Sequence, residues 1–160
     1  MNAAFQRGFS LLELLLVVVI LGVIAGLTVP NFAPAYSHVL IKKTADDMAF
    51  AMRYAQVQAV TKNKKYQLQF DDSYMQYWLT RAGQDEESFE RLQGKMGRTF
   101  VVADGITVRA ENPTVAFFPN GDIEKSEIQL ETKGGTLVVS TMDQKNHVLV
   151  YALDETGEKL

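Results

Sequence analysis

The most constraining feature of this sequence is a long apolar segment near its N-terminus that contains one acidic side chain. From Arg7 the chain reads RGFSLLELLLVVVILGVIAGLTVPNF, and between Phe9 and Phe32 the only charged residue is Glu13. No residue from Leu14 to Tyr36 is charged, which is enough for the roughly 20 apolar residues that cross a ~30 Å hydrocarbon layer. An ionised carboxylate at the centre of a membrane costs roughly 2.5–3.5 kcal/mol on insertion scales, so Glu13 needs a partner.

Two ordinary interpretations of this segment leave Glu13 unexplained. In the first, the segment is a plain transmembrane anchor with an acid near one end. In the second, it is a secretory signal peptide, with Arg7 as its basic region and cleavage after Val23-Ile24-Ala25. The apolar character continues past Ala25, however, and a carboxylate is unusual in the apolar part of a signal peptide.

A third interpretation places the cleavage before the apolar run, between Gly8 and Phe9. Phe9 would then carry a new α-amine, and Glu13 would lie four residues further on, on the same face of a helix. The carboxylate would also lie near the positive end of the helix dipole. Since an anion beside a cation is less costly in a low dielectric, the amine of the same chain or of a neighbouring chain can serve as the partner of Glu13.

The stretch Gly8-Phe9-Ser10-Leu11-Leu12-Glu13 and the uncharged run after it resemble the N-terminal signature of type IV pilins and pseudopilins. The resemblance implies that a prepilin peptidase cleaves after Gly8 and methylates Phe9, and that Glu13 serves subunit registration and assembly. It implies a leader peptide at residues 1–8, a transmembrane and assembly half of a helix at 9–36, and a periplasmic domain at 37–160. Arg7, the only basic residue of the leader, favours a cytoplasmic N-terminus in the inner membrane.

A helical pattern extends the apolar segment to about Asn63, with an interruption near Pro30. Pro30 removes a backbone hydrogen bond and Gly22 and Gly26 lower the helix propensity, so we expect a kink or a locally melted turn there. Beyond it, apolar residues step by four and three along one face: Ile41, Ala45, Met48, Met52, Ala55 and Ala59. A second apolar stripe beside the first contains Phe50, Tyr54 and Val57. The first half of this helix must pack in a bilayer or against other copies, and the second half can lie on a sheet.

The remainder of the chain carries the alternating pattern and the turn signals of an antiparallel sheet. The expected strands cover residues 66–70, 74–80, 99–103, 106–109, 115–118, 127–132, 136–141 and 147–153. Gly134-Gly135 is the strongest hairpin signal, and Pro119-Asn120-Gly121-Asp122 forms another turn. Residues 82–98 are charged and irregular. The sequence predicts an α+β fold, in which the second half of one long N-terminal helix packs on an antiparallel β-sheet.

Three stretches of this second part resemble, more narrowly, the minor pseudopilin H group of type II secretion and the related minor pilins. They are KTADDMAFAMRYAQVQAVTKNKKYQLQFD, the turn region VAFFPNGDIEKSEIQL and the ending HVLVYALDETGEKL. The segment from Ala82 to Ala103 matches no part of that group, and we expect partner specificity to differ there. The resemblance implies other pseudopilins or pilins as helix-packing partners, together with an inner-membrane assembly platform.

Composition and motifs argue against catalysis, cofactors and nucleic acid. The chain has no cysteine, which excludes disulfides, thiolate metal sites and a cysteine nucleophile. Its formal net charge of −3 comes without a basic stripe that would follow phosphates. The common nucleotide, hydrolase and zinc-peptidase motifs are lacking, and the two histidines, His38 and His147, are far apart in the sequence. We therefore expect no enzyme activity, no cofactor, no metal and no direct nucleic-acid contact.

The predicted function is that of a minor pseudopilin, a structural subunit of the pilus-like filament of a type II secretion system. Three alternatives are a major type IV pilin, a minor pilin of an adhesion, motility or DNA-uptake pilus, and a secreted enzyme or binding protein. Major pilins often carry a C-terminal disulfide loop, which this chain cannot form. The acidic balance argues against DNA contact, and a mature N-terminus at Gly26 would support a conventional secreted protein.

Overall fold

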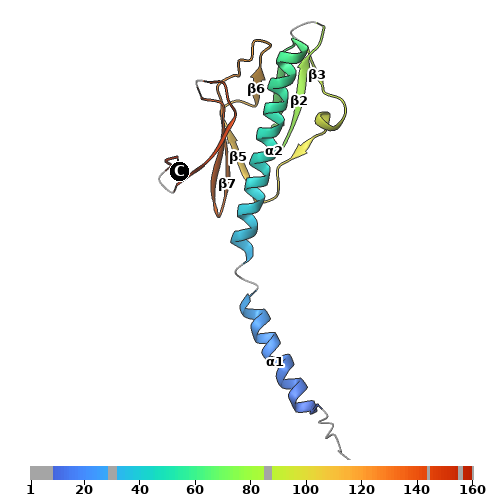
Figure 1. Ribbon diagram of the computed structural model, residues 1–160, viewed down its shortest axis with the longest axis vertical. Coiled ribbons are helices and arrows are strands. Elements are labelled where there is room, and N and C mark those ends of the chain that lie inside the picture. The colour runs from blue at the N-terminus through green and yellow to red at the C-terminus, as the bar shows by residue number, and fades with distance from the viewer. Residues whose placement is uncertain (1–8, 29–31, 85–87, 144, 155–156, 160) are drawn as a thin grey trace, which may run out of the picture. The chain divides into compact units, whose positions relative to one another are not determined.

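The structure, a computed structural model, describes residues 9–28, 32–84, 88–143, 145–154 and 157–159 (Figure 1). The chain falls into two units, Met1–Ala35 and Tyr36–Leu160. The first contains helix α1 (Leu11–Thr28) and the start of helix α2 (Phe32–Lys62). The second contains the rest of α2 and, among its described residues, two β-sheets.

Helix α1 consists almost entirely of apolar residues, with Glu13 in its first turn. Its large apolar side chains between Leu11 and Ile24 are exposed, from 43% for Val17 to 83% for Leu11. Across the described residues, no helix combines the length and the apolar character needed to cross a membrane. Pro30, where we predicted a kink, lies outside the described residues.

Helix α2 ends at Lys62, which confirms the helix end predicted near Asn63. Asn63 has a φ of 50°, the left-handed conformation that asparagine tolerates best after glycine. Its N–H donates to the Val60 carbonyl at 3.4 Å, and the Lys64 N–H donates to the Ala59 carbonyl at 3.2 Å. This pair of bonds is a Schellman cap, which satisfies the last carbonyls of the helix and reverses the chain.

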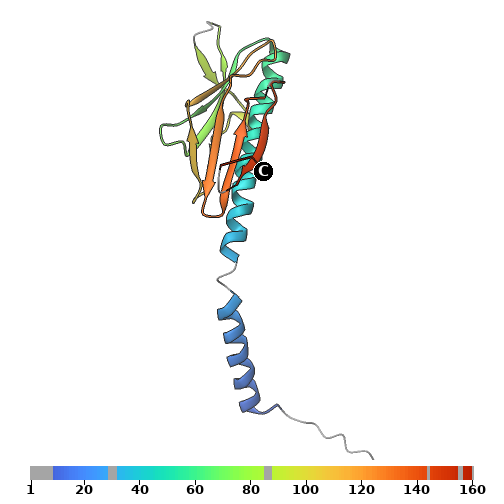
Figure 2. The same ribbon diagram turned by 90° about the vertical axis from the view of Figure 1, so that its left-hand side faces the viewer.

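Two antiparallel sheets follow α2, where the sequence predicted one (Figure 2). Sheet A has the order β3-β2-β1-β6, with β4 also paired to β2; its strands are β1 (Tyr66–Phe70), β2 (Gln76–Ala82), β3 (Phe89–Arg91), β4 (Phe100–Val101) and β6 (Thr114–Phe117). Sheet B has the order β5-β7-β8-β9; its strands are β5 (Thr107–Ala110), β7 (Glu127–Thr132), β8 (Gly135–Ser140) and β9 (Leu149–Leu153). The α+β class and the packing of a helix on antiparallel β-structure are confirmed.

The segment predicted to be irregular contains a strand and a short helix. Strand β3 pairs with β2 through Ala82 and Phe89, and a 3-10 helix covers Lys95–Gly97. Gly97 lies so close to the Leu92 backbone that an added Cβ would be 1.7 Å from its carbonyl oxygen. Only glycine therefore fits there.

One hydrophobic core joins α2 to both sheets. The stripe predicted on α2 is buried, with Ile41 exposed by 2% and the other five residues fully buried. It meets Leu68, Leu79 and Phe117 of sheet A and Ile128 and Leu130 of sheet B in one cluster. Figure 1 shows α2 with β2 and β3 on one side and β5 and β7 on the other. The alternating burial along β1 and β7 thus directs one face of each strand toward the same core.

Tyr77 makes the folded state sensitive to alkaline pH. Its ring is buried and stacks on Phe100 with centroids 5.0 Å apart. Burial, reinforced by the Asp47 carboxylate and opposed by Arg98, raises the pKa of Tyr77 above its ordinary value. A raised folded-state pKa means that the associated stability is complete below the unfolded-state pKa of about 10 and is lost as the pH rises beyond it.

We therefore expect the free energy of unfolding to fall between about pH 10 and pH 12, and to fall less steeply in Tyr77→Phe. Urea titrations followed by the fluorescence of Trp78, the only tryptophan, would measure this. The variant at pH 7 serves as the control for packing. Equal slopes above pH 10 in both proteins would contradict the role of Tyr77.

Candidate assembly surfaces

The N-terminal motif forms the start of helix α1. The Ser10 hydroxyl accepts a hydrogen bond from the Leu12 N–H at 3.2 Å, and the Ser10 carbonyl accepts from the Glu13 and Leu14 N–H groups at 3.0 and 3.2 Å. Ser10 is therefore the N-cap, and Glu13 is the third helical residue, the position where a carboxylate best complements the helix dipole. The sequence motif thus encodes a defined helix start as well as a charge.

Phe9 and Glu13 both lie at this helix start, and both are exposed to solvent. The Phe9 side chain is 74% exposed, and Glu13 is also exposed. Within the part of the chain that the structure describes, the Glu13 carboxylate makes no hydrogen bond and no ion pair. Gly8, the predicted residue before the cleavage site, lies outside the described residues.

A second exposed apolar surface lies on α2, opposite the core. It contains Tyr36, Val39, Phe50, Val57 and Val60, which we call the outer stripe and which are 51–68% exposed. The spacings of three, seven and eleven residues keep these side chains on one face of the helix. Phe50 and Val57 of the predicted second stripe belong to it, whereas Tyr54 is half-buried against the core. Charged residues of α2 lie between these apolar side chains on the same face.

Two polar residues of α2 hold the neighbouring loops in place, and the sequence analysis missed both. The Gln56 side-chain amide donates to the carbonyls of Gly121 and Asn146 at 3.2 and 3.0 Å. Arg53 donates to the Val148 carbonyl at 2.9 Å. The sequence gives little indication that Gln56 binds these loops, because its acceptors lie 65 and 90 residues away in the chain. The position of its amide at the margin of the buried stripe is the one indication.

The predicted turn at Pro119-Asn120-Gly121-Asp122 is one of these docked loops. Gly121 has a φ of 91°, and its N–H donates to the Phe118 carbonyl at 3.0 Å. The Asn120 and Asp122 side chains bond within the turn, and Asp122 also accepts from Asn146 at 2.9 Å. The turn and the loop before β9 are therefore tied to each other and to α2.

His147 and two aromatic residues of sheet A and its turn have local structural contacts. His147 lies 3.4 Å from Asp143, and both are on the surface loop before β9. Trp78 lies beneath the Arg91 guanidinium, 4.9 Å from its ring centre, and Tyr74 packs on Phe70. Among the described residues, no three His, Cys, Asp or Glu side chains are grouped as metal ligands.

Comparisons with known proteins agree with these features. Two protein families match the sequence: residues 4–29 match the family described as Prokaryotic N-terminal methylation motif, and residues 44–154 match Type II transport protein GspH. No curated protein matches the chain.

The fold is similar to that of two solved structures. The minor pseudopilin EpsH from the type 2 secretion system of Vibrio cholerae has a TM-score of 0.62 and 13% identity, over 74% of this chain and 99% of that one. The type IV minor pilin FimU of Pseudomonas aeruginosa has a TM-score of 0.54 and 14% identity, over 78% and 95%. At such identities the likeness shows the fold alone, and the family match over residues 44–154 shows the relationship. The chain belongs to the GspH family of type II transport proteins, the minor pseudopilins that its motifs resemble.

Proposed function

We propose that the protein is a minor structural subunit of the pilus-like filament of a type II secretion system. It is anchored in the inner membrane by residues 9–36, matured by a prepilin peptidase that cleaves between Gly8 and Phe9, and methylated at Phe9. The observation that carries the proposal is the exposed apolar helix α1, with a capped start and Glu13 as its one charged residue. Such a surface needs either lipid or other apolar helices around it.

The two environments suggest how assembly proceeds. Before assembly, the lipid covers α1 while the domain of residues 37–160 lies in the periplasm. When the inner-membrane assembly platform lifts the subunit out, the α1 helices of neighbouring subunits replace the lipid. Dispersion contacts are similar in the two states, so the apolar area alone favours neither strongly.

Glu13 can favour the assembled filament over the subunit in lipid. The α-amine of a neighbouring processed subunit is a cation that only cleavage at Phe9 creates next to the apolar helix. Pairing it with Glu13 removes an unpaired carboxylate from a low dielectric and sets the axial position of one subunit against the next. The pairing therefore links proteolytic processing to assembly.

A structural subunit, rather than an enzyme, is the function that these surfaces support. The polar side chains described above, such as Glu13 and His147, lie apart from one another at a helix start and on a loop. The extended exposed surfaces, helix α1 and the outer stripe of α2, are apolar. The outer stripe of α2 offers a second contact surface to neighbouring pilins or pseudopilins. The segment of residues 82–103, with Val101 exposed at its end, is where we expect subunit-specific contacts to differ.

A minor pilin of an adhesion, motility or DNA-uptake pilus is the second candidate, because the fold is also similar to the type IV minor pilin FimU. Deleting the gene would distinguish the two. Loss of protein secretion with normal pili supports the pseudopilin, and loss of pili with normal secretion supports the pilin.

The experiment that tests the proposal is intact-mass measurement with N-terminal sequencing of the membrane-derived protein. We expect a chain that begins at N-methylated Phe9 when the peptidase is present and at Met1 when it is absent. Gly8→Val, which places a branched side chain before the cleaved bond, is expected to keep Met1 in both strains. A soluble chain that begins at Gly26 would contradict the proposal, as would an uncut wild-type chain in the presence of the peptidase.

A further inference from the structure

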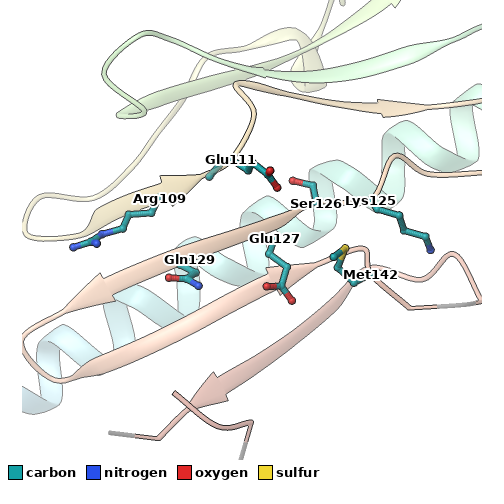
Figure 3. A pocket seen from close by; sticks show the side chains of 8 residues that line it. Arg109, Glu111, Lys125, Ser126, Glu127, Gln129 and Met142 are labelled. Carbon is teal, nitrogen blue, oxygen red and sulfur yellow. The ribbon is translucent and has the colours of Figure 1, made fainter. Parts of the chain in front are cut away.

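We propose that the outer edge of strand β9 pairs with an extended strand of a neighbouring subunit, which thereby extends sheet B. The proposal rests on the proposed function for the nature of the partner, and on the unpaired backbone of this edge for the conformation of the partner. Figure 3 shows sheet B from close by, with β5, which carries Arg109, at one edge and β9 at the other. The unpaired N–H and C=O groups of an edge strand can pair with a further strand.

The C-terminal residues show which backbone groups of β9 point outward. Leu153 forms an antiparallel bridge with the segment after it, and the Asp154 N–H donates to the Glu158 carbonyl at 2.9 Å. This bond lies on the side of β9 opposite β8, so the backbone groups of Leu153 point to β8. Since the two directions alternate along a strand, the N–H and C=O groups of Val150 and Ala152 point outward.

Most of these outward groups are unpaired. Among the described residues, none bonds to the N–H or C=O of Val150 or to the N–H of Ala152 on this edge. The Val148 carbonyl accepts from Arg53 at 2.9 Å, which limits the open edge at one end, and the bridge of Leu153 limits it at the other. The open edge is therefore short, and it suits a partner strand near the lower end of the usual range of about 3–10 residues.

The other sheet edges in the described part of the chain are short, charged or covered. Beside β6, Phe117 bridges to Ile123, and the Ala116 carbonyl accepts from the Glu124 N–H. Strand β4 has two residues, β3 has three, of which two are charged, and β5 has four, including Arg109. Strand β9 has five residues, with the sequence LVYAL, and none is charged or proline. Proteins commonly protect their edges against pairing, so an open apolar edge indicates that it has a partner strand.

The surface beside this edge suits the side chains of an added strand. Helix α2 runs along β9 in the opposite direction, because Val57 and Val148 line one pocket while Ile41 and Leu153 line another. The first pocket has a volume of about 460 Å³ and lies where α2 passes the start of β9. Val57 belongs to the outer stripe, so a strand added here would cover its exposed side chain as well as the open backbone.

The direction of α2 argues for a different subunit as the partner, and against a second copy paired through its own β9. Two antiparallel β9 strands are related by a twofold axis perpendicular to the sheet. Because α2 lies along β9, this axis would also reverse the direction of α2 in the second copy. Subunits anchored in one membrane have helices that run the same way. The edge therefore fits a strand from another part of a neighbouring pilin or pseudopilin.

Amide hydrogen exchange of the full-length protein in detergent micelles tests whether the edge is open. We expect the Val150 and Ala152 amides to exchange at least about tenfold faster than those of Tyr151 and Leu153, whose N–H groups point to β8. Equally slow exchange of all four amides would overturn the proposal, because the edge would then already be covered by the chain itself.

Val150→Pro tests whether the edge is used, because it removes one outward N–H group and leaves the bonds to β8 intact. We expect an unfolding temperature close to that of the wild type. The fraction that co-purifies with sheared filaments should fall at least about fivefold, since the backbone bond to the partner is lost. Val150→Thr keeps the N–H group and the branched shape, and it should enter filaments normally. Normal incorporation of Val150→Pro, or equal losses in the two variants, would overturn the proposal.

Ala152→Pro repeats the test with a smaller change of side chain, and it decides the matter if Val150→Pro unfolds. It removes the second outward N–H group and should cause a similar loss from filaments, whereas normal incorporation would overturn the proposal. Both proline variants should still begin at N-methylated Phe9. A failure of strand pairing is thus separate from a failure of the N-terminal test of the proposed function.

Discussion

Glu13→Gln is expected to insert into the membrane and to be cleaved, yet to enter filaments at least about tenfold less than the wild type. Glutamine keeps the size of the side chain and removes its charge, so the α-amine of a neighbouring subunit is left buried without an anion. Breaking one partner of a buried ion pair typically costs about 3–5 kcal/mol, and 1.4 kcal/mol already corresponds to tenfold. The measurement is the fraction of subunit that co-purifies with sheared filaments, divided by the fraction in membranes.

Two control variants separate charge from other effects. Glu13→Asp keeps the charge on a shorter side chain and should recover part of the incorporation. Asp72→Asn removes an exposed carboxylate in the turn before β2 and should have no effect. Normal incorporation of Glu13→Gln would show that the carboxylate serves only the helix start, through the dipole and the Ser10 cap.

Phe117→Ala is expected to lower the free energy of unfolding by about 3–5 kcal/mol, the range for large-to-small changes in a packed core. The Phe117 side chain is fully buried within the shared core. Its backbone pairs with Tyr66 of β1 and bridges to Ile123, so the strand has little freedom to close the cavity. Urea unfolding followed by Trp78 fluorescence would give the difference, and its slope would show whether the unfolded state changed.

The adjacent phenylalanine is the matched control. Phe118 is half-buried, and its ring lies 5.1 Å from the Lys65 ammonium. Phe118→Ala should cost only about 1–2 kcal/mol, because less apolar area returns to water. Equal losses in the two variants would mean that the core does not depend on the Phe117 position as the structure implies. Domains of this size are stable by about 5–15 kcal/mol, so the first variant should still fold.

Sequence periodicity predicted the helix face well because its signal is local and repeated. Ile41, Met48 and Met52 recur at the helical period over several turns, and all are buried. The hairpin predicted at Gly134-Gly135 is present, but its two-residue loop is Lys133-Gly134, because Gly135 already pairs with Thr132 as the first residue of β8. The signature from Gly8 to Glu13 identified the family, whereas its cleavage and pairing roles stay predictions.

Other parts of the fold depend on contacts between distant residues. Strand β3 contains only one apolar residue, Phe89, and owes its existence to pairing with β2. The division into two sheets arises because β1 pairs with β6, whereas β5, which precedes β6 in the chain, pairs with β7 in the other sheet. Neither has a local signal.

The outer stripe of α2 has a further consequence for how subunits can be spaced. Lys43, Asp46 and Arg53 lie on the same face and interrupt the apolar side chains between Val39 and Val57. A neighbouring helix that slid along this face would bring its apolar residues over these charges at some offsets and over Phe50 at others. Covering a charged side chain with apolar residues is costly, so only a few offsets are favourable. We therefore expect a neighbouring helix that packs on this face to be held at a few preferred axial positions.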